Sequence, residues 1–528
     1  MPPASPAGPD TRPVRSPARA VARRGDAAHP WLALGTVSLG LMMILLDTSI
    51  VSVANATIGR DLRGSLAGLQ WVTSAYLLAI ATGLVTGGKL GDHVGRRRMF
   101  TWGAAGFALA SAGCGLAVSV AMLTGFRVAQ GLAGAAMMPQ TLATLRATFD
   151  ASRFQLAVGV YVGVSSLAMA SGPIVGGVLV QDAGWRSIFF LNVVIGPAVV
   201  AAAQFFMPET RDPRAAGIDV PGAVLLAGAL FCLVWALVNS GTHPWASAYT
   251  LGFLAAAAAL LAFWAARMAR AATPLVPLSL FRAASFDAGI GVVTTAGFAM
   301  YGTLFYLTLY LQRVHGDSPV AAGASLLPLT VLSGLVAPAG GMLARRVPLR
   351  LLLCCGLLLL CGGALGLTTL APGTGEAGLW PWLALIGSGV GLSLTGGSQA
   401  VVGSASPSRA GVATGIQQTS LNVGGALATA VLGSVVASRV SAGLPAALAA
   451  HGVSSSVAAV ITAASGSIAQ GIVPRSPGVP PPAAATITEV SHQVMTSGIH
   501  AAVIVIAAIA GAAAVAALCL IRRPEPHG

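Results

Sequence analysis

Long apolar runs recur along almost the whole chain, and they restrict the possible folds more than any other feature of the sequence. Each run is about as long as the ~20 helical residues that cross the ~30 Å hydrocarbon core of a bilayer. Only 8% of the 528 residues are charged, whereas a soluble domain has about 25%. A backbone in lipid must satisfy its own hydrogen bonds, so the runs predict an all-α membrane protein.

We expect fourteen transmembrane helices. The predicted spans are residues 31–58, 69–90, 99–119, 121–145, 156–180, 188–207, 218–239, 246–266, 286–311, 320–343, 349–371, 379–403, 411–436 and 500–521. An even number of spans places both termini on one side. With that side in the cytoplasm, 22 of the 29 basic residues lie inside, six lie outside and Arg127 lies within a span. The positive-inside rule therefore predicts that both termini are cytoplasmic.

The spans group into two bundles with an insertion between them. We expect a disordered cytoplasmic tail at 1–30, an N-terminal six-helix bundle at 31–207, two inserted helices with flanking loops at 208–285, a C-terminal six-helix bundle at 286–521 and a cytoplasmic tail at 522–528. Residues 437–499 are rich in Ala, Ser and Pro and are interpreted as a long extracellular loop, with an interfacial helix or a fifteenth span near 454–473 as the alternative. The first span is too long for a signal peptide and carries Asp47.

A short internal repeat supports two parallel bundles. The loop after the second span begins at Gly88, and the loop after the tenth begins at Gly341. Aligning these glycines places Leu90 over Leu343 and Val94 over Val347, while Arg345 takes the place of Asp92. Parallel repeats of this kind surround a central path in many transporters.

Several classes of function are disfavoured by composition. The net charge of +14 would suit nucleic-acid binding, but the basic residues lie in short loops and form no soluble patch. The six cysteines fall inside apolar runs and are interpreted as buried apolar side chains. The sequence contains no nucleotide-binding loop, haem motif or zinc-ligand spacing, so we expect no cofactor, no metal site and no enzyme or ATP-driven pump.

The loop from Gly88 to Arg98 reads GKLGDHVGRRR. It resembles G-x-L-x-D-x-x-G-R-[KR]-[KR], the signature of the major facilitator superfamily. The whole chain resembles the fourteen-helix drug:proton antiporters of that superfamily. The resemblance implies a major facilitator fold of two six-helix bundles plus two inserted helices, working by alternating access.

This resemblance implies that the loop forms a cytoplasmic gate. The candidate gate residues are Gly88, Gly91, Asp92, Gly95, Arg96 and Arg97. The glycines allow a tight turn and close helix approach. Asp92 can accept hydrogen bonds from helix N-termini or pair with an arginine, whereas His93 stands where the family often has Arg or Lys. An ordinary basic loop is the alternative interpretation.

Asp47 and Arg127 are the candidate proton-coupling residues. Arg127 with Gln130 and Gly131 resembles the family motif R-x-x-Q-G-x-G-A-A, with one residue more before Gly134, and the arginine of that motif is associated with proton coupling. Leu46-Asp47-Thr48 resembles the family motif of the first span. Burial favours the protonated form of a carboxylate and a nearby arginine favours the ionised form. A carboxylate whose two forms are balanced in this way can bind and release a proton. Asp47 is therefore the candidate proton carrier, and Arg127 adjusts how tightly it binds the proton. The alternatives are a structural polar contact for Asp47 and an Arg127 that snorkels from a helix end.

The fifth predicted span carries a further motif. Gly163, Gly172, Pro173, Gly176 and Gly177 resemble the antiporter motif of the superfamily, with Ala168 replacing its middle glycine. Glycine and proline in series suit a kinked helix packed closely at the interface between the bundles. The motif implies export only through the resemblance, and plain helix packing is the alternative.

Polar and aromatic side chains within spans are candidates for the substrate cavity. They are Asn55, Gln130, Tyr306, Gln417, Gln418 and Asn422. Amides without partners are costly in lipid, so these side chains are expected to face a cavity or another helix.

The sequence and its resemblance together predict a monomeric, proton-coupled exporter of small amphipathic drugs or antibiotics in the inner membrane of a bacterium. Its expected partners are the substrate, protons and the lipid bilayer, with no nucleic acid. The alternatives are an exporter of an endogenous metabolite, such as an amino acid, a lipid precursor or a siderophore, and a membrane receptor or enzyme. Asp47 is nearly alone as an intramembrane carboxylate, which favours neutral or monocationic substrates over dications.

Overall fold

The computed structural model describes residues 29–211, 219–239, 245–271, 276–343, 346–371, 375–405, 410–473 and 481–520, together with residues 217, 243 and 274. Within these ranges, thirteen helical segments are long and apolar enough to cross a membrane. Most of the tails predicted at 1–30 and 522–528 lie outside the described residues. The chain is a multi-pass membrane protein.

The N-terminal half consists of six long helices. They are α1 (Pro30–Asp61), α2 (Leu66–Val94), α3 (Arg96–Gly115), α4 (Val120–Thr148), α5 (Ala151–Ala183) and α6 (Arg186–Phe206). Only α3 falls outside the thirteen segments, because it begins with three arginines and is otherwise rich in alanine and glycine. It nevertheless packs along α4 and α6 and is the third of the fourteen predicted spans. Serines cap the N-termini of α2 and α4, where Ser65 and Ser119 accept backbone hydrogen bonds.

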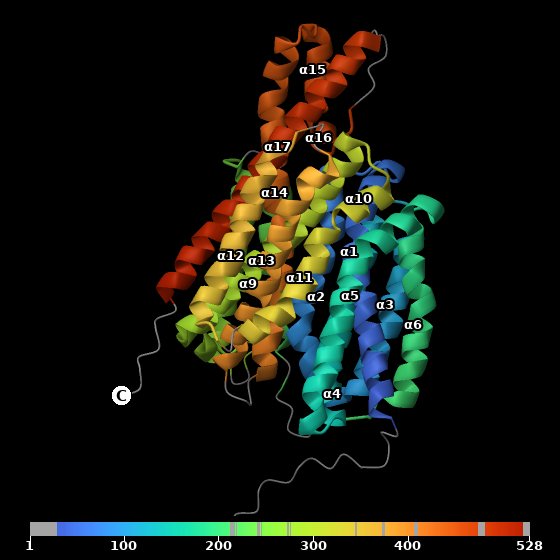
Figure 1. Cartoon of the computed structure of the whole chain (residues 1–528), viewed down its shortest axis with the longest axis vertical. Helices are drawn as coiled ribbons and strands as arrows, with labels where there is room; N and C mark the ends of the chain where they lie inside the picture. The colour runs from blue at the N-terminus through green and yellow to red at the C-terminus, as the bar shows by residue number, and fades with distance from the viewer. Residues whose placement is uncertain are drawn as a thin grey trace, which may run out of the picture.

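The C-terminal half begins after two inserted helices, α7 (Val220–Val238) and α8 (Ala248–Arg270). A short 3₁₀ turn, η2 (Leu278–Arg282), leads into this half. Its long elements are α9 (Ala284–Tyr310), α10 (Pro319–Ser325) with α11 (Leu327–Leu343), α12 (Leu349–Gly366), α13 (Glu376–Gly403), α14 (Ala410–Ala450) and α17 (Pro481–Leu520). The π-helical turn η3 (Leu311–His315) continues α9. Figure 1 shows the two halves side by side.

The same pairing order recurs in the two halves. In the N-terminal half α2 and α3 both pack on α4, while α1 packs on α5 and α6. In the C-terminal half α11 and α12 both pack on α13, while α9 packs on α14 and α17. Each contact therefore has an equivalent at the same position in the other half, as expected for a repeat of six helices. The inserted pair packs against α2 and α14, where the halves meet.

The prediction of a long loop at 437–499 is wrong in its secondary structure. Helix α14 continues to Ala450, α17 starts at Pro481, and the short helices α15 (Ser455–Ala463) and α16 (Ser465–Ile468) lie between them. These helices project from one end of the molecule (Figure 1). Leu444, Leu448, Ile461, Ile487 and Val490 are all buried, so a small apolar core holds the projection together. We call it the hairpin and that end of the molecule the hairpin end; the opposite end, with Gly88–Arg98, is the loop end.

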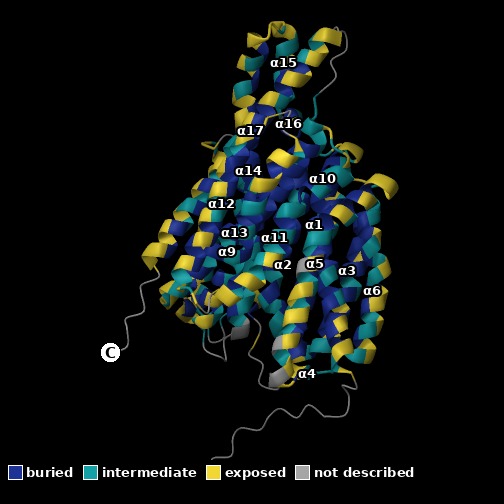
Figure 2. Cartoon of the chain, viewed as in Figure 1, coloured by how far each residue is buried: buried dark blue, intermediate teal, exposed yellow. Residues whose placement is uncertain are grey.

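Burial is greatest where the helices of the two halves meet. Figure 2 shows buried residues running through the middle of the bundle and exposed residues on its outer helices. Helices α1 and α9 are buried along most of their length, whereas α8 is mostly exposed. A hydrophobic exterior is expected for a protein whose solvent is lipid.

Candidate functional site

A buried ion pair lies inside the N-terminal half. The Arg127 guanidinium on α4 donates through Nη1 to Oδ2 of Asp47 on α1. Both side chains are 1% exposed. A fully buried ion pair is unusual because both charges lose their hydration, and it needs further hydrogen bonds to compensate.

Two amides complete the coordination of the Asp47 carboxylate. Gln130 Nε2 and Asn192 Nδ2 both donate to Asp47 Oδ1, at 2.8 and 2.9 Å. Gln130 also accepts from Arg127 Nη1 at 2.7 Å and donates to Ser111 Oγ at 2.8 Å. Gln130 on α4 and Asn192 on α6 are both buried. Helices α1, α4 and α6 thus converge on one carboxylate, with α3 joined to it through Ser111 and Gln130, and we call these residues the Asp47 cluster.

Arg127 is held from its other side by α2. Its guanidinium carbon lies 3.7 Å from the centre of the Tyr76 ring, in a cation–π arrangement. Its Nε donates to the carbonyl of Val72 at 3.3 Å. The snorkelling interpretation of Arg127 is therefore wrong, because the guanidinium turns into the bundle rather than towards the membrane surface.

The two buried charges of the cluster compensate each other. With Asp47 ionised, the charges cancel and the carboxylate accepts from three side chains. A proton on Asp47 would leave Arg127 as an uncompensated buried cation, held by Gln130 and the Val72 carbonyl. Because an unpaired buried charge costs several kcal/mol, the ion pair ties α1 to α4.

The segment Gly88–Arg98 lies at the loop end, where α2 passes into α3. Arg96 binds Asp92 through Nη2 at 2.9 Å and Nε at 3.1 Å. Arg97 and Arg98 each lie 3.7 Å from Glu209, and the Arg96 amide donates to the Thr210 carbonyl at 3.0 Å. These contacts all stay within the N-terminal half or its connection to α7.

Glycines allow this segment to pack closely. A Cβ at Gly91 would overlap the Gln140 side chain of α4, whereas one at Gly88 would be 3.4 Å from Pro139. Gly95 has φ +118° and ends α2, and a Cβ there would overlap the Glu209 carboxylate. Only glycine adopts this backbone conformation readily.

Replacing Gly95 with Ala is expected to destabilise the protein by about 1–3 kcal/mol, because a side chain at this backbone angle is strained and meets Glu209. Thermal stability of the detergent-solubilised protein, followed by size exclusion after heating, measures the effect. Gly125→Ala is the matched control, since Gly125 is inside α4 and a Cβ at this position would have nothing within 4 Å. Equal melting of both variants would contradict the prediction.

Part of the glycine motif of α5 lies where the halves touch, and part packs on α1 of the same half. A Cβ at Gly177 would come within 2.7 Å of the backbone of Pro319 and Val320 on α10, and one at Gly172 or Gly176 would meet α1. The Pro173 carbonyl lies so close to Gly323 of α10 that a Cβ on that glycine would overlap it. A Cβ at Gly163, nearer the loop end, would have nothing within 4 Å.

Further contacts join the halves at the hairpin end. Gln312 in η3 donates to the Val53 carbonyl of α1 at 2.9 Å, and Arg313 donates to the Ala56 carbonyl. A π-helical turn at such a point is common at functional sites. Towards the loop end, by contrast, α5 exposes Leu156 and Leu167. The halves are therefore closed against each other at the hairpin end.

The proposed cavity residues fall into two groups. Gln130 belongs to the Asp47 cluster, and the Tyr306 hydroxyl is buried between the halves, where it accepts from Gln70 and donates to the Thr429 carbonyl, both at 2.8 Å.

Asn55 is buried on α1, and neither amide atom has a hydrogen-bond partner among the described residues. Gln417, Gln418 and Asn422 follow one another along α14, where Asn422 donates to the Gln418 carbonyl at 2.8 Å. The Oε1 atom of Gln417 also lacks a described partner.

The family model of the Major Facilitator Superfamily matches residues 37–429, which is most of both halves. The chain belongs to the major facilitator superfamily. A similar curated protein is the "Tetracenomycin C resistance and export protein" of Streptomyces glaucescens, 42% identical over 95% of this chain and 93% of that protein. The "Multidrug resistance protein Stp" of Mycobacterium tuberculosis H37Rv is 36% identical over 78% of this chain and 77% of that protein.

Solved structures of the major facilitator superfamily share the fold. A bacterial homolog of the human lysosomal transporter Spinster, in an inward-facing and unoccupied conformation, superimposes with a TM-score of 0.61 at 17% identity, covering 95% of this chain and 100% of that one. The major facilitator fold predicted from the sequence is therefore confirmed. Membership of this superfamily makes the protein a transporter.

Asn192 and Ser111 are site residues that sequence reasoning missed in this major facilitator protein. The sequence predicts only that Asn192 lies near the start of a transmembrane helix, whereas in the structure its amide donates directly to Asp47. A signal was present, because a carboxamide inside an apolar run is costly unless another polar group meets it. Ser111 gives no such signal, since a serine in a helix can bond its own backbone.

Proposed function

We propose that this protein exports small amphipathic drugs or antibiotics across the inner membrane of a bacterium in exchange for protons. The observation that carries the proposal is the buried Asp47–Arg127 pair with its two amide ligands, in a chain whose relatives are named for drug or antibiotic resistance and export. The "Multidrug efflux pump LfrA" of Mycolicibacterium smegmatis is a further such relative, 31% identical over 77% of this chain.

The positive-inside rule supports an orientation with the loop end and both termini in the cytoplasm. The hairpin then projects outside the cell. In this orientation the contacts of α1 with η3, and of α5 with α10, close the outer side of the transporter.

A proton arriving from outside would bind to Asp47 and change the contacts of its carboxylate. Protonation would weaken its bond to Arg127, and Gln130 and Asn192 would lose part of their attraction to Oδ1. Helix α1 carries both Asp47 and the carbonyls that receive Gln312 and Arg313. The state of the cluster can therefore be transmitted along one helix to the outer contacts. Both conformers and both protonation states must be accessible for exchange to occur.

Asn55, Gln417, Gln418 and Asn422 are the proposed substrate contacts. Asn55 and Gln417 have buried amide atoms without described partners, and a substrate could satisfy them. Tyr306 and Gln130 are proposed to act indirectly, through the inter-half contacts and the Asp47 cluster. The segment Gly88–Arg98 is the proposed cytoplasmic gate, with Asp92 and Arg96 paired inside one half in this conformer. We propose that one monomer is sufficient, since each half supplies one wall of the path.

Substrate-evoked proton release from everted vesicles tests the proposal. Vesicles holding an acid-inside gradient receive cationic, neutral and anionic amphipaths in turn, and a pH-sensitive dye reports the interior. Alkalinisation by a subset of compounds is expected, with neutral or monocationic ones most active because Asp47 is a lone carboxylate. Vesicles without the protein give the background. No change in the interior pH with any compound, in vesicles shown to contain the inserted protein, would favour export of an endogenous metabolite.

A further inference from the structure

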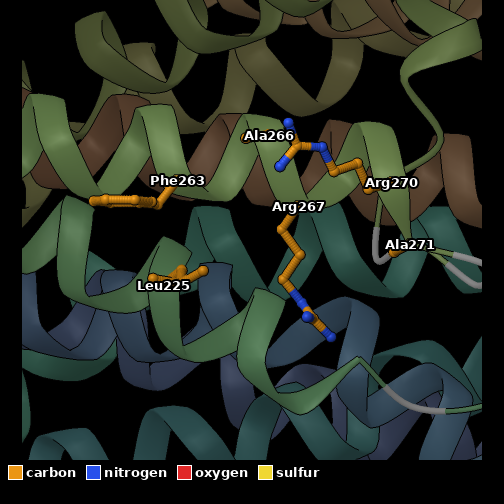
Figure 3. A pocket seen from close by; sticks show the side chains of 6 residues that line it. All are labelled: Leu225, Phe263, Ala266, Arg267, Arg270 and Ala271. Carbon is orange, nitrogen blue, oxygen red and sulfur yellow. The ribbon is translucent and has the colours of Figure 1, made fainter.

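The inserted pair α7–α8 carries a groove on its outer surface. Leu225 on α7 and Phe263, Ala266, Arg267, Arg270 and Ala271 on α8 line it. Its volume is about 440 Å³. Figure 3 shows Phe263 and Leu225 at one side of the groove and the two arginines at the other. The groove lies at the loop end, because α7 starts there and α8 ends there.

The apolar part of the groove faces away from the protein. Phe263 is 67% exposed, and Val224 beside Leu225 is 64% exposed. The inserted pair packs on the rest of the bundle mainly through α7, with Met268 at the end of α8 buried against the C-terminal half. These exposed side chains therefore meet acyl chains, and the groove opens into the bilayer rather than into a transport path.

The polar part of the groove has an excess of one positive charge. Arg267 binds Asp219 at 2.7 Å through Nη2 and at 2.8 Å through Nε, and the Asp219 side chain is 2% exposed. Their charges cancel. Arg270, one turn further along α8, is exposed and forms no ion pair or hydrogen bond with any residue that the structure describes. The groove thus combines an apolar slot with one guanidinium, at its membrane-surface end, that no described residue compensates.

We propose that this groove binds one anionic phospholipid of the cytoplasmic leaflet. A phosphodiester accepts two hydrogen bonds from a guanidinium in its preferred geometry, and Arg270 provides that donor. The acyl chains lie along Phe263 and Leu225. Basic pockets between transmembrane helices on the cytoplasmic side are suited to such headgroups. A zwitterionic lipid gains less, because its own ammonium group competes for the phosphate.

The site is connected to the signature loop. Lys89 at the end of α2 donates to the carbonyls of Gly217 and Pro274, both at 3.3 Å. Gly217 precedes α7 and Pro274 follows α8. Asp219, the partner of Arg267, also accepts from the Gly222 amide at 3.0 Å and so caps α7. A lipid held at Arg270 therefore stabilises the same helix ends that anchor Lys89.

Native mass spectrometry of the purified full-length protein tests the site directly, without reference to transport. The protein in neutral detergent is titrated with dioleoyl phosphatidylglycerol and, separately, with dioleoyl phosphatidylcholine. Wild type is expected to bind one phosphatidylglycerol in preference to phosphatidylcholine. Arg270→Gln should weaken phosphatidylglycerol binding about fivefold, the effect of one basic residue at a membrane surface, and weaken phosphatidylcholine binding by less. Arg282→Gln is the matched control, since it removes an exposed arginine of η2 at the same end.

A second variant and a soluble probe separate the alternatives. Ala266→Trp fills the groove without changing charge and is expected to weaken binding of both lipids. Glycerol phosphate, the headgroup chemistry without chains, is expected not to compete. Equal binding of the two lipids by wild type, or equal losses in Arg270→Gln and Arg282→Gln, would overturn the proposal. Full competition by glycerol phosphate would assign the site to a free phosphate instead.

Discussion

Asp47→Asn is expected to abolish substrate-evoked proton movement while leaving the folded protein able to bind and exchange substrate. Asparagine keeps the shape of the side chain and can accept a hydrogen bond from Arg127, but it cannot take up a proton. Its amide group would also oppose the donors Gln130 and Asn192, which now point at Asp47 Oδ1. The protein loses coupling rather than its substrate path.

Two assays in proteoliposomes separate these outcomes. Proton-coupled uptake against a pH gradient is expected to fall to background, a loss of at least tenfold, whereas substrate counterflow without a gradient persists. Asp182→Asn is the matched control, because Asp182 is an exposed carboxylate near the end of α5. Coupled uptake that survives in Asp47→Asn would remove Asp47 from the proton path. Loss of both coupled uptake and counterflow would point to a structural role.

Gly177→Leu is expected to hold the two halves apart at the hairpin end and to reduce transport at least tenfold. The position of a Cβ at Gly177 is 2.7 Å from backbone atoms of α10, which cannot move aside as a side chain can. Overpacking of this kind costs about 1–3 kcal/mol. Applied to one conformer of a two-state equilibrium, it lowers the population of that conformer about 5- to 150-fold.

Spin-label distances across the hairpin end measure this effect. Labels at Asp61 on α1 and Ser318 before α10, in a background lacking the six cysteines, report on the two halves. The distance distribution is expected to shift to longer values in Gly177→Leu. Gly163→Ala, from the same motif, should change neither distance nor transport, because nothing lies within 4 Å of its Cβ position. An unchanged distribution in Gly177→Leu would contradict the proposed closure.

The helices of the fold could be predicted because a helix that crosses lipid needs apolar side chains along its length and therefore forms an apolar run in the sequence. Asp47 and Arg127 were predictable for a related reason, since a charge inside such a run stands out. Their direct contact was not, because sequence spacing within one helix says nothing about rotation of two helices about their axes. Asn192 is an example: its position near the start of α6 in the sequence does not reveal that its side chain faces α1.

The hairpin could not be predicted from hydropathy alone, because hydropathy separates membrane spans from other segments and does not separate helix from loop. Residues 437–450 are rich in alanine, and three alanines follow the prolines at the start of α17; alanine favours helix whatever the solvent. Pro445 lies inside α14, and the other prolines of the segment are confined to one short stretch. Pro481 and Pro482 open α17, where proline is well tolerated. A polar segment between two spans can therefore be a rigid helix pair.

The unbroken course of α14 and α17 turns the hairpin into a lever arm. Residues 481–499 at 1.5 Å per residue extend the last helix by about 28 Å. Any rocking of the C-terminal half during export would sweep the tip through several ångströms of open solution. A binder or dye on the tip would then count transport cycles of a single molecule from outside the cell.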